Sequence, residues 1–217
     1  MTERRVNDAL EQAAFHLSLI KKRLLSIRQA VARLSVTSLS FDYILTLDYA
    51  FLDVRKVIEE LMLLSLCAHE FAQIELSNKM RREWNAERLM RYLERVNPRF
   101  FPDGIETVET EEEGIAGQFV TTSRPCLTKG EAADIYNFCG SVLHASNMPL
   151  QPDRVRHRYA RLVEFAEKAC GLLDTFEIDL TGNGWVICGH LHIDRPDIPP
   201  DLFNGPVFRE VAQGRAT

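Results

Sequence analysis

Apolar heptads dominate the first 35 residues of the chain and limit what it can fold into. One series recurs every seven residues, and a second follows three positions later: Leu10, Leu17, Leu24 and Val31, then Ala13, Ile20, Ile27 and Leu34. Two series with this offset form the a and d seam of a helix that packs lengthwise against another helix. The pattern predicts a long helix over residues 4–35.

A second helix is predicted over residues 42–75, where apolar residues again alternate by three and four: Ile44, Leu47, Phe51, Val54, Ile58 and Leu61. Within it, Leu61–Ala68 is apolar on nearly every side, so we expect this part to be buried all round. A third helix is predicted over residues 82–96. It should end before Pro98, because proline disfavours a helical conformation in the residue that precedes it.

The chain between residues 97 and 127 is rich in proline, glycine and acidic residues. We predict a loop excursion there, with short strands at residues 105–108 and 118–122. Thr128 and Glu131 then have the spacing of a capping box, which should start the next helix. A further helix is expected from about residue 153 to residue 173, after Pro149 and Pro152.

The period of the pattern changes from 3.6 to 2 near the C-terminus. Phe176–Leu180 and Trp185–Ile193 read as a β-hairpin across the turn Thr181–Gly184, and the proline-rich residues 195–206 read as irregular. The fold class is therefore mainly α, an antiparallel bundle led by two long N-terminal helices with a small C-terminal antiparallel β-element. We expect residues 1–174 to form the bundle and residues 175–217 to pack on the same domain.

Composition narrows the function classes. The net charge of −5 argues mildly against a protein that coats DNA. Five cysteines without a CxxC pair support neither a disulfide framework nor a zinc finger, and they fit reduced thiols in the cytoplasm. No apolar run is long enough to cross a membrane, and no cofactor motif is present. We therefore expect a cytoplasmic protein with no cofactor.

The stretch YNFCGSVLHASN, residues 136–147, holds the first candidate site. At 100° per residue, Tyr136, Gly140, His144 and Asn147 fall on one flank of a helix. A glycine inside a helix costs about 1 kcal/mol relative to alanine, so we predict that Gly140 lies at a close helix–helix contact. His144 would then cap the last turn. The alternative is a His/Tyr/Asn cluster for acid–base chemistry or ligand binding.

A second candidate lies on the second helix, where Asp48, Arg55 and Glu59 share one edge that runs into the buried stretch. A buried pair must be matched to be tolerated. The simple interpretation is an ion pair within the helix. The sharper one is that Arg55 and Glu59 meet Tyr136 or His144 across the bundle, which gives a composite site of five residues: Arg55, Glu59, Tyr136, His144 and Asn147.

Two arginine stripes could hold RNA or polyphosphate, one at residues 81–95 and one at residues 154–161. Glutamates are interleaved with both, so we favour solvated faces with ion pairs. Cys188, His190 and His192 alternate on a predicted strand and could ligate zinc. Trp185, Ile187, Leu191 and Ile193 should face the core on the opposite side. Because no fourth ligand is evident, we expect no metal.

Three segments carry a resemblance: LDVRKVIEELMLLSLCAHE, WNAERLMRYLERVNPRFFPDG and LTKGEAADIYNFCGSVLHASNMP. Together they resemble a family of uncharacterised bacterial proteins with long N-terminal helices and a short C-terminal sheet. The helical part is also distantly similar to HEPN-type bundles, which are usually dimeric and often cleave RNA in toxin or phage-defence systems. The HEPN active-site pattern places an Arg four to six residues before a His, and none of the six histidines has such an Arg.

The leading functional expectation is a non-catalytic cytoplasmic interaction or ligand-binding module. Because a helix seam this long commonly pairs with a second copy, we expect a homodimer. The alternative is a HEPN-like RNase or nucleotide-modifying enzyme, which would need the composite site of five residues. A protein partner fits the first function, and RNA fits the second.

Overall fold

The computed structural model describes residues 3–35, 37–72, 74, 76–108, 118–144, 151–180 and 185–206. Its helices are α1 (Glu3–Ser35), α2 (Phe41–Phe71), α3 (Asn78–Arg81), α4 (Ala86–Val96), α5 (Lys129–Leu143) and α6 (Pro152–Leu173). Its strands are β1 (Asp103–Val108), β2 (Gln118–Thr121), β3 (Thr175–Asp179), β4 (Trp185–His190) and β5 (Asp201–Pro206). The predicted fold class is confirmed: two long N-terminal helices lead a mainly helical fold with a small antiparallel sheet.

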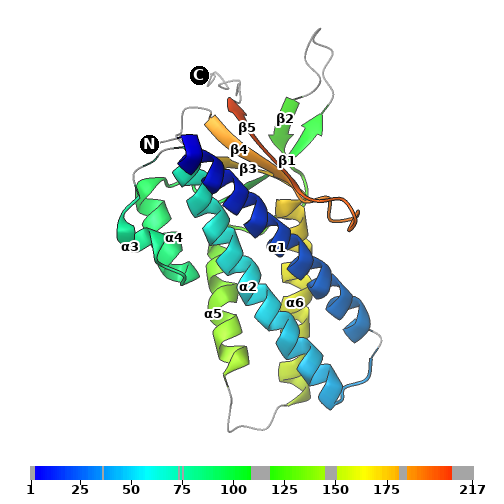
Figure 1. Cartoon of the computed structure of the whole chain (residues 1–217). Coiled ribbons are helices and arrows are strands. Elements are labelled where there is room, and N and C mark those ends of the chain that lie inside the picture. The colour runs from blue at the N-terminus through cyan, green and yellow to red at the C-terminus, as the bar shows by residue number, and fades with distance from the viewer. Residues whose placement is uncertain are drawn as a thin grey trace, which may run out of the picture.

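Helices α1 and α2 form an antiparallel hairpin that is the centre of the fold (Figure 1). The seam of α1 is buried inside the chain: Ala13, Leu17, Ile20, Leu24, Ile27 and Leu34 are all at most 3% exposed. Ser40 starts α2, because its side chain accepts a hydrogen bond from the backbone N–H of Tyr43. The apolar heptad positions of α1 are thus buried against α2 of the same chain, so they give no reason to expect a second copy.

Helices α5 and α6 complete the bundle behind the hairpin (Figure 1). The predicted capping box is present, since Thr128 accepts from the N–H of Glu131 and the Glu131 carboxylate accepts from the N–H of Thr128. The stretch Leu61–Ala68 is buried as expected, apart from a half-buried Leu63. Among the described residues, no helix combines the length and the apolar character that crossing a membrane would require.

The five strands form one antiparallel sheet in the order β2-β1-β3-β4-β5, at the end of the bundle opposite the α1–α2 turn (Figure 1). Strands β3 and β4 form the predicted hairpin, with Phe176 opposite Gly189 and Ile178 opposite Ile187. The loop excursion predicted between residues 97 and 127 supplies β1 and β2 to the same sheet, because Asp103 and Gly104 of β1 pair with β3. The turn Thr181–Gly184 lies outside the described residues.

The prediction of an irregular segment over residues 195–206 is wrong at its end, where Asp201–Pro206 forms β5 against β4. Proline argued against a strand because it has no N–H for the ladder. An edge strand pairs on one side only, so it tolerates prolines at its ends, here Pro200 just before it and Pro206 at its last position.

The helix predicted over residues 82–96 starts four residues later than predicted, and a separate short helix precedes it. A single turn, α3, is capped by Ser77, and α4 starts only at Ala86, where the side chain of Asn85 accepts from the N–H of Arg88. Met90 and Leu93 are buried as expected, whereas Val96 is exposed. Trp84 lies in the connection between α3 and α4.

Candidate functional site

Arg55, Glu59 and Tyr136 meet between α2 and α5, as the sharper of the two interpretations required. Arg55 Nη2 donates to the Tyr136 hydroxyl at 2.9 Å, and Arg55 Nε donates to Glu59 Oε1 at 3.2 Å. The Tyr136 hydroxyl donates to the same Glu59 oxygen at 3.2 Å. The guanidinium carbon also lies 4.4 Å from the centre of the tyrosine ring, within the range of a cation–π contact. We call these three residues the α2–α5 cluster.

The carboxylate of Glu59 is the most buried charge of the α2–α5 cluster. The residue is 6% exposed, and its second oxygen accepts from Lys56 Nζ at 2.7 Å. One carboxylate therefore faces two cations and a phenol, so both of its oxygens have partners. Matching of this kind is what allows a charge to be buried at all.

Burial raises the pKa of Tyr136 above its ordinary value, and the neighbouring Glu59 charge adds to this, while Arg55 opposes it. The phenol is therefore protonated at neutral pH and acts as a hydrogen-bond donor to Glu59. Each polar group of the α2–α5 cluster is engaged by another member or by Lys56. The arrangement is suited to joining two helices, and its catalytic role stays a prediction.

The prediction that Gly140 lies at a close helix–helix contact is wrong. A Cβ on Gly140 would have one neighbour within 4 Å, Arg55 Nη1 at 3.8 Å, which is ordinary van der Waals contact. The missing side chain leaves space beside a guanidinium and does not bring two backbones together. Gly140 is half-buried, so α5 tolerates the glycine without a steric need for it.

The structure does not bring His144 into the α2–α5 cluster. His144 is the C-cap of α5, with an extended backbone at φ −79° and ψ 134°, and its side chain is exposed. Its N–H donates to the carbonyl of Gly140, and α5 ends at Leu143, whereas the single-flank pattern assumed a helix as far as Asn147. Asn147 lies outside the described residues. The helical geometry therefore unites Arg55, Glu59 and Tyr136 only.

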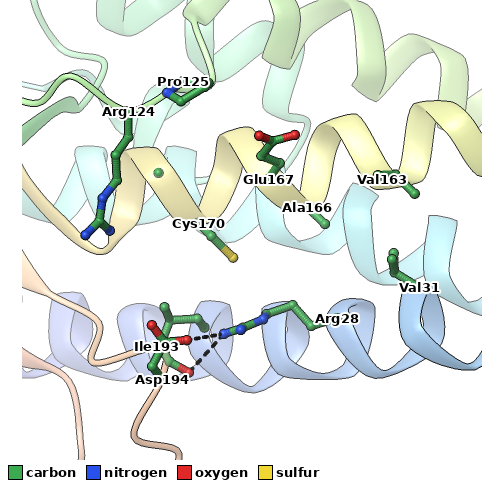
Figure 2. A pocket seen from close by; sticks show the side chains of 11 residues that line it. Arg28, Val31, Arg124, Pro125, Val163, Ala166, Glu167, Cys170, Ile193 and Asp194 are labelled. Carbon is green, nitrogen blue, oxygen red and sulfur yellow. Dashed lines mark hydrogen bonds and ion pairs between the residues drawn. The ribbon is translucent and has the colours of Figure 1, made fainter.

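A groove of about 480 Å³ lies between α1 and α6 (Figure 2). Val31 of α1 and Val163 and Ala166 of α6 give it apolar walls. The segment before α5 closes one end, where Gly171 of α6 permits a close approach. A Cβ on Gly171 would lie 2.2 Å from the carbonyl oxygen of Pro125, so any residue larger than glycine would clash at this position.

The charged residues at the ends of the groove are already paired. Arg28 Nη1 donates to Asp194 Oδ1 at 2.8 Å (Figure 2), and Arg124 Nη1 donates to Asp174 Oδ2 at 2.6 Å. The Cys170 thiol also faces the groove, and burial raises its pKa to about 11, so it stays protonated at neutral pH. A protonated thiol is a poor nucleophile. The groove offers apolar contact more than reactive chemistry.

Cys188, His190 and His192 do not form a ligand set. Cys188 is buried in a small cluster with Ile105 and Val186, on the face of β4 that was expected to be open. His192 lies beyond β4, at φ 49°, and its Nε2 is 2.7 Å from Asp201 Oδ2. Within the described part of the chain, no three His, Cys, Asp or Glu side chains are placed to hold a metal ion. Trp185 was expected to face the core, but it is half exposed.

A buried polar network around His69 was missed by the sequence patterns. His69 is fully buried; its Nδ1 lies 2.6 Å from the carbonyl oxygen of Ser65, and its Nε2 lies 3.0 Å from Asn97 Nδ2. Burial lowers the pKa of His69, which favours the neutral ring. Asn97 also donates to the carbonyl of Asp179, so the network joins α2, α4 and β3. The signal available in advance was a histidine directly after Leu61–Ala68, the stretch expected to be buried all round.

Comparison of the chain with protein-family models, with curated proteins and with solved structures finds no match in any of the three. The resemblance to an uncharacterised bacterial family and to HEPN-type bundles therefore stays a prediction.

Proposed function

We propose that the protein is a non-catalytic interaction module that forms a homodimer through the outer face of the first half of α2. One observation carries the proposal. Four large apolar residues, spaced by four, four and three, project from one side of this half: Phe41, Leu45, Tyr49 and Leu52. They are 72%, 38%, 68% and 42% exposed, respectively. We call them the α2 stripe.

The α2 stripe is too continuous to be the ordinary scatter of surface apolar residues. Isolated exposed apolar side chains need no explanation, whereas a contiguous row with a polar rim is typical of an interface. Burying one such side chain contributes about 1.5–3 kcal/mol, so four of them give a dimer a substantial driving force. Two aromatic residues in the row add rigid contact area of the kind that dominates interface energetics.

The charges along this side of α2 favour a second copy in the antiparallel direction. Asp42 lies in the first turn of α2, next to the start of the stripe, and Lys56 lies one turn beyond its end, with its ammonium group half exposed while it donates to Glu59. A twofold axis near the middle of the stripe brings Asp42 of each copy close to Lys56 of the other. A twofold interface uses the same patch on both subunits, so this self-complementary row meets its basic requirement.

The α2–α5 cluster supports the non-catalytic part of the proposal. A general acid or base needs a proton-transfer group that substrate can reach. Glu59 is almost fully buried and engaged by three donors, and Tyr136 is held as a donor to it. Nothing in this arrangement favours the HEPN-like nuclease, which remains the alternative expectation.

Light scattering coupled to gel filtration tests the proposal. We expect the wild-type chain to elute with about twice its mass of 24.8 kDa. Tyr49→Glu places a charge in the proposed interface, and we expect it to elute as a monomer with an unchanged circular dichroism spectrum. Trp84→Ala is the matched control, since it removes an equally exposed aromatic residue elsewhere, and it should stay dimeric. A wild-type chain that is monomeric at every concentration would refute the proposal.

A further inference from the structure

The corner formed by α3 and α4, residues 78–96, is basic although the chain as a whole is acidic. It holds six basic residues, Lys79, Arg81, Arg82, Arg88, Arg91 and Arg95, against three glutamates. Its net charge is +3 in a chain whose net charge is −5. An anionic ligand is therefore attracted to this corner.

Trp84 stands at this corner with 67% of its surface exposed. The loop that carries it is braced, because Glu83 Oε1 accepts from the backbone N–H groups of Trp84 and Asn85 at 3.2 and 3.1 Å. Asn85 also caps α4. These bonds hold the backbone in place while the indole stays in solvent. A fixed, exposed aromatic ring forgoes the stabilisation of burial and leaves a face free for stacking.

Three arginines share one side of α4, which begins two residues after Trp84. Arg88, Arg91 and Arg95 are spaced by three and four, which places them in a row about 10 Å long. The opposite side of α4 is buried through Leu89 and other apolar residues, so the row faces solvent.

The carboxylates near this row hold its arginines only weakly. Arg91 Nη2 is 3.7 Å from Glu87, and both side chains are about half exposed. Arg88 Nη1 is 3.6 Å from Oε2 of Glu83, whose other oxygen accepts from the loop N–H groups. An exposed pair such as Arg91–Glu87 contributes little and exchanges readily with other anions. Arg82 and Arg95 have no carboxylate within ion-pair distance among the residues that the structure describes.

We infer that the α3–α4 corner binds single-stranded nucleic acid, with Trp84 stacking on a base and Arg88, Arg91 and Arg95 contacting phosphates. Stacking on an aromatic ring needs an exposed base face, which a single strand offers and a duplex does not. Arginine suits phosphate because its planar donors match the phosphate oxygens.

Fluorescence anisotropy of a labelled oligo(dT) of about twelve nucleotides tests the inference with the full-length protein. We expect saturable binding at low salt that weakens as the salt concentration rises. Trp84→Ala should weaken it by roughly 5- to 150-fold, the loss expected for one stacked base. Arg91→Ala should reduce the slope of log affinity against log salt by about 0.7, because one phosphate contact is lost.

Two controls separate stacking from general attraction between charges. Trp185→Phe removes the other tryptophan, so quenching of the remaining fluorescence reports on Trp84 directly. In this variant we expect oligo(dT) to bind as in wild type and to quench Trp84, and inorganic polyphosphate to leave its fluorescence unchanged. Tyr49→Glu should bind oligo(dT) too, so a failure of the proposed homodimer is distinguishable from a failure of this site.

Three results would overturn the inference. The first is an absence of oligo(dT) binding at low salt. The second is binding that Trp84→Ala leaves unchanged, which means adventitious attraction between charges. The third is a duplex of equal length that binds as tightly as the single strand. All four variants replace exposed side chains, and a thermal melt that matches wild type confirms that each is folded.

Discussion

The two halves of α2 have the same helical backbone and opposite surroundings. In the first half, Phe41 and Tyr49 are exposed although they are large and aromatic. In the second half, Glu59 and His69 are buried although they are polar. Both halves depart from the rule that polarity decides burial, and they depart from it in opposite directions.

The contrast separates two uses of one helix. In the second half, the two buried ionisable side chains have partners from other elements, although the buried Ser65 hydroxyl has none: Glu59 has Tyr136 of α5, and His69 has Asn97 at the end of α4. These contacts fix how the helices pack. In the first half, the side chains of the α2 stripe stay 38–72% exposed, which leaves apolar surface for an interface. We therefore assign fold stability to the second half and association to the first.

The largest expected effect compares two leucines on this one helix. Leu61→Ala, in the fully buried half, should lower the free energy of unfolding by about 2–5 kcal/mol, because it removes core contacts and leaves a cavity. Leu52→Ala changes the same side chain in the exposed half and should cost less than about 1 kcal/mol. Urea denaturation in the Tyr49→Glu background measures both without a contribution from association. Equal losses would show that the two halves do not differ.

The next effect concerns the α2–α5 cluster. Glu59→Gln leaves Arg55 and Lys56 without their carboxylate and should lower the free energy of unfolding by about 2 kcal/mol. Tyr136→Phe should cost about 1 kcal/mol. Because both remove the same hydrogen bond, the double variant should lose less than the sum of the two. Strict additivity in a double-mutant cycle would mean that the phenol and the carboxylate do not interact.

The pKa of Tyr136 gives a test at alkaline pH. Its folded-state pKa is raised above the ordinary value of 10.0, so its contribution to stability is complete below pH 10 and is lost as pH rises through the folded-state pKa. The stability advantage of wild type over Tyr136→Phe, about 1 kcal/mol at pH 8, should therefore shrink above pH 10. Paired denaturation curves at several pH values cancel the titration of other groups. If the stability advantage of wild type over Tyr136→Phe grows with pH, folding does not raise the pKa of Tyr136 and the assignment is wrong.

The smallest effect compares two helical glycines. Gly140→Ala should raise stability by up to about 1 kcal/mol, because alanine favours the helix and the added Cβ meets only the end of Arg55. Gly171→Ala should destabilise the protein, since its Cβ would collide with the backbone of Pro125. Thermal melts of the two variants should move in opposite directions. A lower melting temperature for Gly140→Ala would instead support the close helix–helix contact that the sequence analysis predicted at Gly140.

The sequence predicted those features that depend on helical periodicity. The heptads of α1, the burial of Leu61–Ala68 and the meeting of Arg55 and Glu59 with Tyr136 all follow from which residues share a face. Periodicity places residues on a face but does not say what covers it. For this reason the buried seam of α1 suggested a second copy, whereas its partner is α2 of the same chain.

Features that depend on pairing or on helix ends escaped the sequence analysis. Strand β5 was missed because its prolines are tolerated only at an edge, and edge position is a property of the assembled sheet. His144 was misplaced because α5 ends at Leu143, and helix ends are weakly specified without a terminal glycine. Gly140 was misjudged because a glycine permits a close contact without requiring one.

Disulfide cross-linking tests most directly whether a second copy covers the α2 stripe. Tyr49→Cys places a thiol near the middle of the stripe, where the proposed twofold axis brings two copies together. The native thiols are buried or half-buried, and burial raises the pKa of Cys67, Cys139 and Cys188 to about 12, so they react slowly. Under mild oxidation we predict a covalent dimer from Tyr49→Cys and none from the control Trp185→Cys, a half-exposed site on β4. No covalent dimer, or equal amounts from both variants, would contradict the account.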